Sequence, residues 1–122
     1  MAATGLTRGQ LDAIRDALVV VLPGRSPADV ALKFFFRDHK QLGSKDRALV
    51  ADTVYSVLRH RRVLEAVTPA ATPRDLALGA LVRFGGVSVS AMESVLRPEE
   101  RTWLTALKAR DLDELPFGVR AE

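Results

Sequence analysis

The chain has 122 residues, 48% of them hydrophobic and 27% charged, and a formal net charge of +3. This length and composition indicate one globular domain rather than a disordered segment. The sequence contains no cysteine, which excludes disulfides, thiolate metal sites and cysteine nucleophiles. The longest apolar run near the N-terminus, Ala17–Leu22, is too short for a secretion signal or a membrane span, so we expect a cytoplasmic location.

The first two predicted elements are amphipathic helices. The first is expected to begin at Thr7, a favourable N-cap residue, and to end at Pro23-Gly24. Its apolar stripe consists of Leu11, Ile14, Leu18 and Val21. The second is expected over residues 26–38, with Ser26 as N-cap and Pro27 at the first helical position.

Three adjacent phenylalanines, Phe34–Phe36, cover too wide an arc for one apolar stripe. This pattern favours a central helix that packs on more than one side. The alternative is that Phe35 or Phe36 is exposed and stacks on a base or docks a partner domain.

The third predicted helix is the longest and runs continuously from Ser44 to about Glu65. One side is apolar and contains Val50, Val54, Val57 and Leu58. The opposite side is polar and contains Asp52, Ser56 and Arg59.

Three further helices are expected in the second half of the chain. One begins with Thr72 as N-cap and ends at Gly85-Gly86, and its Gly79 is expected to allow a neighbouring helix to approach closely. A short helix follows Ser88, and a last one begins at Pro98. No alternating run predicts a strand. The sequence therefore predicts an all-α fold, an orthogonal or irregular bundle of five to six short helices.

Positive charge is concentrated between Arg37 and Arg62. This segment contains seven basic and three acidic residues, for a charge of +4, whereas the rest of the chain carries −1. The basic residues are Arg37, Lys40, Lys45, Arg47, Arg59, Arg61 and Arg62. Such local charge is typical of a surface that binds a polyanion, and the alternative is an ordinary solvated face.

Two parts of this basic segment are favourable for RNA. Residues 38–47 join two helices and end at a helix N-terminus, where free backbone N–H groups attract anions. Arg59 and Arg62 share one face of a continuous helix, and the planar guanidinium pairs with phosphate and stacks on unpaired bases. Interaction of these arginines with a helix C-terminus is the alternative. Arg47 projects toward the apolar side, so a half-buried arginine paired with an acid is as well supported there as an RNA contact.

The sequence lacks the common catalytic motifs. It contains no phosphate-binding loop, and no serine lies in a nucleophile-elbow context. Two histidines without cysteines fall short of a usual transition-metal site. We therefore expect no enzyme activity, no metal and no cofactor in this chain alone.

Two motifs resemble the N-terminal region of the RsmB (Sun) family of ribosomal-RNA methyltransferases. The first is Phe35-Phe36-Arg37-Asp38-His39-Lys40-Gln41-Leu42-Gly43-Ser44-Lys45-Asp46-Arg47, and the second is Val54-Tyr55-Ser56-Val57-Leu58-Arg59-His60-Arg61-Arg62. Thr72-Pro73-Arg74 and Leu81-Val82-Arg83-Phe84-Gly85-Gly86 are also similar. The resemblance extends over most of the chain from about Ser26 onward.

The resemblance implies a NusB-like helical domain that holds small-subunit ribosomal RNA for cytosine-C5 methylation. It also implies a Rossmann-like catalytic domain that uses S-adenosylmethionine and cysteine chemistry. That domain would lie C-terminal to this chain, and we expect roughly the last ten residues to lead into it. The residues assigned to RNA binding are the seven basic residues named above. Ribosomal RNA and the catalytic domain are the expected partners.

The alternative function is a protein-interaction module of NusB-like fold with little RNA affinity of its own. It would dock on its own methyltransferase domain or bind a partner of the transcription-antitermination type. Phosphate contacts weaken steeply with salt, whereas an apolar docking surface does not. A large exposed apolar patch at Phe34–Phe36 would favour a protein partner.

Overall fold

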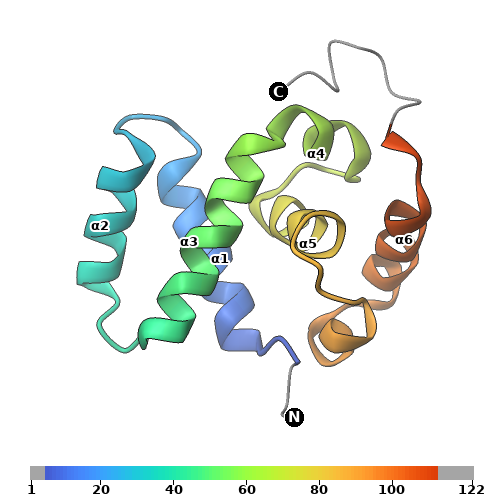
Figure 1. The fold of residues 1–122 in the computed structure, drawn as a ribbon, viewed down its shortest axis with the longest axis horizontal. Coiled ribbons are helices and arrows are strands. Elements are labelled where there is room, and N and C mark those ends of the chain that lie inside the picture. The colour runs from blue at the N-terminus through green and yellow to red at the C-terminus, as the bar shows by residue number, and fades with distance from the viewer. Residues whose placement is uncertain (1–4, 113–122) are drawn as a thin grey trace.

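Residues 5–112, the part of the chain that the computed structural model describes, form six α-helices and one 3-10 helix, with no strand (Figure 1). In chain order these are α1 (Arg8–Val21), α2 (Ala28–Asp38), α3 (Ser44–Arg59), α4 (Arg61–Val67), α5 (Pro73–Arg83), the 3-10 helix η1 (Ser90–Val95) and α6 (Pro98–Ala109). The all-α prediction is confirmed. The expectation that the last ten residues lead into a further region concerns residues outside those described.

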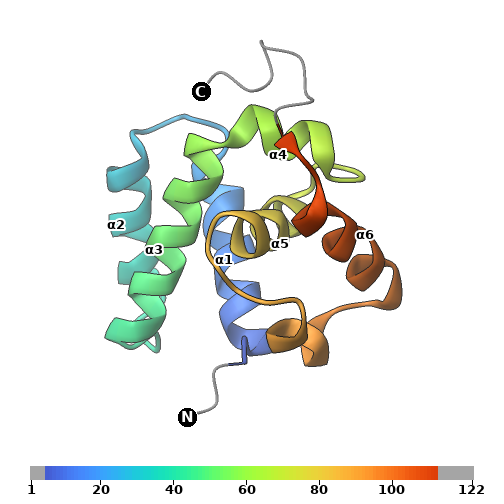
Figure 2. The ribbon, with the colours of Figure 1, turned by 45° about the vertical axis from the view of Figure 1, so that its right-hand side comes forward.

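Helix α1 begins where the sequence predicts. The hydroxyl of Thr7 accepts a hydrogen bond from the backbone N–H of Gln10, and the Gln10 side chain accepts one from the Thr7 N–H, each at 3.0 Å. This reciprocal pair satisfies two N–H groups that the helix leaves unpaired. All four residues of the predicted stripe are buried, and α2, α3 and α5 pack against this helix (Figure 2).

Helix α2 lies at an edge of the bundle, in contact with α1 and α3 (Figure 1). It begins at Ala28, with Pro27 (φ −54°, ψ 147°) as its N-cap, so the prediction of Ser26 as N-cap is wrong. Its buried residues are Ala31, Leu32 and Phe35. The prediction that the phenylalanine-rich helix is central is therefore also wrong, because only one side of α2 meets the core.

The predicted helix over residues 44–65 is divided into two at His60. The backbone of His60 leaves helical geometry (φ −113°, ψ 25°), and α4 starts again at Arg61. The His60 ring stacks on the Phe84 ring, with centroids 3.7 Å apart and planes 6° from parallel. The change of direction lets α4 pack against α5, where Val63 and Leu64 are buried.

Helix α5 is the most deeply buried element, and Figure 1 shows it nearly end-on. Seven consecutive residues, Leu76–Val82, are buried, because α1, α3, α4 and α6 all pack against this helix. A Cβ atom on Gly79 would lie 3.0 Å from Leu64 Cδ2 and 3.4 Å from Thr68 Cγ2. The predicted close approach at Gly79 is therefore confirmed. The N-cap at Thr72 is confirmed as well, since its hydroxyl accepts the Asp75 N–H at 3.0 Å.

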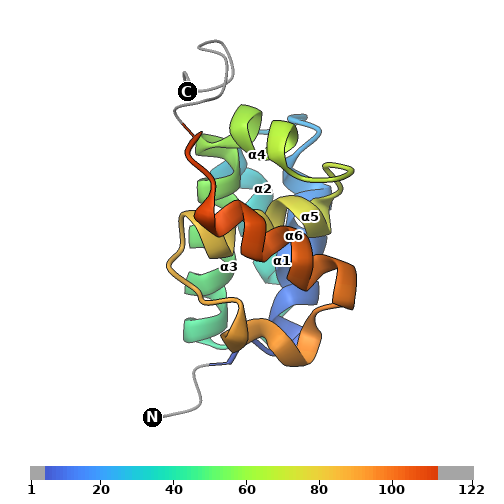
Figure 3. The same ribbon diagram turned by 90° about the vertical axis from the view of Figure 1, so that its right-hand side faces the viewer.

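A buried ion pair joins α5 to α6, which lies in front of α5 in Figure 3. Arg74 Nε donates to Glu100 Oε2 at 2.7 Å, and Arg74 Nη2 donates to Glu100 Oε1 and to the Val95 carbonyl, both at 2.8 Å. The backbone N–H of Arg97 also donates to Glu100 Oε1 at 2.8 Å. The Glu100 side chain is only 4% exposed, and its hydrogen bonds compensate for the loss of water.

This pair predicts a loss of stability in acid. The hydrogen bond from Arg74, opposed by burial, holds the pKa of Glu100 below its ordinary value of 4.5. A depressed carboxyl pKa stabilises the folded state above the ordinary value, and this contribution is lost as the pH falls through the folded-state pKa. The difference in free energy of unfolding between the wild type and Glu100→Gln should thus narrow once the pH drops below 4.5. Urea unfolding at several pH values measures this difference, and a difference that stays constant down to the acid limit would contradict the prediction.

Candidate nucleic-acid interface

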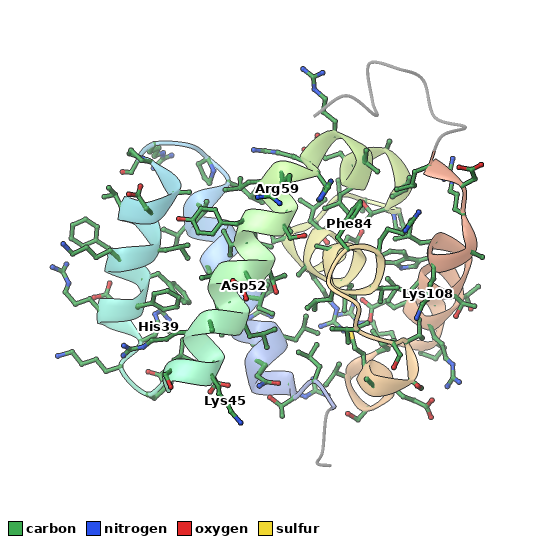
Figure 4. All side chains as sticks on the ribbon, viewed as in Figure 1. His39, Lys45, Asp52, Arg59, Phe84 and Lys108 are labelled. Carbon is green, nitrogen blue, oxygen red and sulfur yellow. The ribbon has the colours of Figure 1, made fainter. Side chains whose placement is uncertain are left out.

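The basic residues predicted to contact RNA form two groups at opposite ends of α3. Figure 4 labels Lys45 and Arg59 near these two ends. Arg37, Lys40 and Arg47 line a hollow where α2 ends and α3 begins, and Arg59, Arg61 and Arg62 line another where α3 ends. Lys45 is exposed and lines neither hollow. Twelve residues separate Arg47 from Arg59, or about 18 Å of helix, so the predicted residues do not form a single patch.

The first hollow, here called the α2–α3 groove, combines cations with aromatic rings. It has a volume of about 630 Å³ and is lined by Lys33, Phe34, Phe36, Arg37, Lys40 and Arg47. None of these lining residues is acidic. Four like charges around one concave surface give a local positive potential that attracts a polyanion. Lys33 is absent from the predicted RNA-binding residues, although it lies one helical turn before Arg37 and therefore on the same face.

Phe34 is the exposed aromatic residue of this groove. Phe34 is 45% exposed, whereas the neighbouring Phe35 is only 4% exposed and belongs to the core. The Arg37 guanidinium carbon lies 4.5 Å from the centre of the Phe34 ring, a cation–π arrangement. Phe36 is partly buried and meets Phe35 edge to face at 5.7 Å. The exposed ring is thus that of Phe34, and not that of Phe35 or Phe36 as in the alternative drawn from the sequence.

Arg47 is exposed and belongs to the α2–α3 groove. Within residues 5–112 it makes no ion pair, so the alternative of a half-buried arginine paired with an acid is wrong. The reason is its position in the first turn of α3, beside the end of α2, where the helix has not yet entered the core. Its guanidinium is therefore available to a ligand.

The second hollow, here called the arginine hollow, lies at the α3–α4 junction. It is lined by Tyr55, Leu58, Arg59, Arg61 and Arg62 and has a volume of about 600 Å³. The prediction that Arg59 and Arg62 share one face of a continuous helix is wrong, because the break at His60 places Arg59 at the end of α3 and Arg62 in α4. Arg61 is partly committed, because its Nε pairs with Glu65 at 3.2 Å and its Nη1 donates to the Leu22 carbonyl at 3.3 Å.

A third hollow, here called the α3–α5 groove, lies between α3 and the end of α5. It has a volume of about 480 Å³ and is lined by Leu49, Asp52, Thr53, Tyr55, Ser56, Arg59, His60, Ala80, Leu81, Phe84, Gly85 and Val87. The stacked rings of His60 and Phe84 line one part of it. Figure 4 labels Asp52, Arg59 and Phe84 around this region. The polar face with Asp52 is apparent from the sequence but the groove is not, because the position of α5 opposite this face does not follow from helical periodicity.

His39 lies on a different side of the α2–α3 connection from the basic groove. Its Nδ1 is 2.8 Å from the Phe35 carbonyl oxygen, and its ring stacks on Phe35 with centroids 3.9 Å apart. The hollow that it lines contains Asp12, Asp16 and Asp46. His39 is therefore placed near acidic side chains of α1 and α3, rather than among the cations.

The described part of the chain carries no sign of a metal centre or a membrane span. No group of three or more histidine, cysteine, aspartate or glutamate side chains that could hold a metal ion occurs among residues 5–112. Within the same range, no helix combines the length and apolar character needed to cross a membrane. Comparisons with models of protein families, with curated proteins and with solved structures found no match.

Proposed function

We propose that this domain binds RNA and presents small-subunit ribosomal RNA to a cytosine-C5 methyltransferase domain of the RsmB (Sun) type. In this proposal the fold is a NusB-like bundle, and the domain works in the cytoplasm. The methyl transfer belongs to a separate catalytic domain that uses S-adenosylmethionine. This chain contains no cysteine and so cannot supply the cysteine chemistry of that reaction. Ribosomal RNA and the catalytic domain are its partners.

The observation that carries the proposal is the composition of the α2–α3 groove. Lys33, Arg37, Lys40 and Arg47 line the groove together with the exposed ring of Phe34, and no acidic side chain lines it. Proteins that bind single-stranded nucleic acid combine a positive groove, which follows the backbone, with aromatic rings on which bases stack. The motif that resembles the methyltransferase family contributes Phe36, Arg37, Lys40 and Arg47 to this groove.

The alternative of a protein-docking surface has less support at this groove. An apolar docking face needs a contiguous exposed apolar patch. Phe34 is exposed, but the side chains that surround it in the groove are cations together with the partly buried Phe36. A partner that replaced water here would have to desolvate four charges, which is costly without matching acids.

The proposal predicts a salt-dependent affinity that depends on Arg37 and Arg47. Four phosphate contacts to single-stranded RNA give a slope of log affinity against log salt of about −2.8, and loss of two contacts reduces it to about −1.4. Arg37→Glu/Arg47→Glu should therefore bind at least roughly tenfold more weakly at low salt. Fluorescence anisotropy with a labelled small-subunit ribosomal RNA hairpin that has an unpaired loop, measured at several salt concentrations, gives both quantities.

The matched control is Arg25→Glu/Arg110→Glu. Both residues are exposed and lie outside the three hollows, and the double change alters the net charge by the same amount. The control should keep most of the affinity and nearly all of the slope. Equal losses in the two double variants, or binding that does not respond to salt, would overturn RNA binding at the α2–α3 groove and favour protein docking.

A further inference from the structure

A stacked pair of aromatic rings, His60 and Phe84, lines part of the α3–α5 groove. The His60 and Phe84 rings are parallel within 6° and 3.7 Å apart, a separation at which two planar rings are in van der Waals contact. Both rings are partly buried and both line the groove. A planar molecule that enters the groove therefore meets two aromatic side chains whose positions are already set by their contact with each other, and neither has to be ordered first.

Polar groups of α3 also line the groove. Asp52, Ser56 and Arg59 follow each other at spacings of four and three residues, so they lie on one face of α3, and all three line the groove. The carboxylate of Asp52 forms no hydrogen bond or ion pair with any residue between 5 and 112. It is the only acid among the lining residues. Its two oxygens are therefore available to donors on a ligand.

The groove adjoins a site that suits a phosphate. Tyr55 and Arg59 line both the α3–α5 groove and the arginine hollow. A ligand whose flat part occupied the groove would place a charged part, attached a few bonds away, beside Arg59 and Arg62. A planar group joined to an anion in this way is the chemistry of a nucleotide.

We propose that the α3–α5 groove binds one unpaired guanine nucleotide, with its base against the His60–Phe84 pair, its Watson–Crick edge on Asp52 and its phosphate at Arg59. This inference rests on the proposed RNA-binding function and gives it a base preference. The α2–α3 groove would follow the RNA backbone and read no sequence. The α3–α5 groove would select the base.

Guanine is the base that fits the free carboxylate. Its N1–H and N2–H₂ groups are adjacent donors, so one carboxylate can accept from both in a bidentate arrangement. Adenine and cytosine place a ring nitrogen that accepts hydrogen bonds next to their amino group, and that nitrogen would face a carboxylate oxygen unfavourably. Unpaired bases are read in this way, by stacking on aromatic rings and by hydrogen bonds along the Watson–Crick edge.

The test compares guanosine, inosine and adenosine 5′-monophosphates in titrations followed by amide NMR spectra of the full chain. Inosine lacks only the 2-amino group of guanosine, so its affinity should be lower by roughly tenfold, the effect of one hydrogen bond to a charged group. The largest shift changes should occur at Ser56, Arg59 and Gly85. Asp52→Asn should abolish the preference for guanosine over inosine, since the new amide nitrogen cannot accept from the 2-amino group.

Two further measurements separate this inference from the proposed function. Asp38→Asn changes the net charge equally at an exposed residue outside the groove, and it should retain the guanosine preference. Arg37→Glu/Arg47→Glu should weaken the RNA hairpin but leave the monophosphate affinities unchanged. Equal affinities of the wild type for the three nucleotides, or equal binding of ribose 5-phosphate, would overturn the guanine site and leave RNA binding at the α2–α3 groove standing. Failure of the wild type to bind the hairpin, with its preference for guanosine monophosphate intact, would overturn only the proposed function.

Discussion

Replacement of Glu100 with alanine should lower the free energy of unfolding by about 3–5 kcal/mol, the usual effect of removing one partner of a buried ion pair. The Arg74 guanidinium, whose side chain is 17% exposed, would keep its charge and lose both hydrogen bonds to the carboxylate. The Arg97 N–H would lose its acceptor too. Since the total free energy of unfolding of a domain of this size is about 5–15 kcal/mol, the variant should lose a large part of it. Urea unfolding followed by far-UV circular dichroism measures the change.

The control for this variant is Glu93→Ala. Glu93 also pairs with an arginine, since Arg101 Nη1 lies 2.7 Å from its Oε1, but both side chains are more than half exposed. Exposed pairs contribute about 0–1 kcal/mol, so this control should unfold nearly like the wild type. Similar small losses in both variants would show that the Arg74–Glu100 pair is not a principal link between α5 and α6.

Gly79→Leu should destabilise the domain by about 3 kcal/mol, at the upper end of the usual cost of overpacking a core. A side chain on Gly79 would enter space already occupied by Leu64, Thr68 and Leu107, the last of which lies 3.6 Å from the expected Cβ position. All three neighbours are buried, so they have no solvent into which to move. Thermal and urea unfolding give the change in free energy.

The matched substitution is Gly9→Leu. Gly9 is an exposed residue of α1, and a Cβ there would have only the Thr7 hydroxyl within 4 Å, at 3.9 Å. Leucine has the higher helix propensity, so this control should be neutral or up to about 1 kcal/mol more stable than the wild type. If Gly79→Leu left the free energy of unfolding unchanged, α4 and α6 would be able to move away from α5 at little cost in stability.

Local signals in the sequence placed most helix starts correctly. Thr7, Thr72 and Pro98 each mark the start of a helix, because a cap or an N-terminal proline acts on backbone groups a few residues away. Gly79 was interpreted correctly as well, since a glycine within a strong helical pattern is costly unless a neighbour needs the space. The predicted NusB-like arrangement of the helices stays a prediction.

The failures have a common cause in tertiary contacts. The break at His60 depends on Phe84, which is 24 residues away in the chain, and no cap or proline marks it. The exposure of Phe34 and of Arg47 depends on α2 lying at an edge, which its apolar residues do not reveal. The α3–α5 groove likewise needs two helices that periodicity treats separately. The sequence thus located the basic segment but could not divide it into two hollows.

The edge position of α2 also has a consequence for local dynamics. This helix is held by three buried side chains, Ala31, Leu32 and Phe35, so its separation from α1 and α3 exposes far less apolar surface than global unfolding does. Its amide protons should therefore exchange with solvent through a local opening that leaves α1, α3 and α5 in place. An RNA strand held by Arg37 on one helix and Arg47 on the next would close this opening, so that ligand binding and the order of α2 become thermodynamically linked.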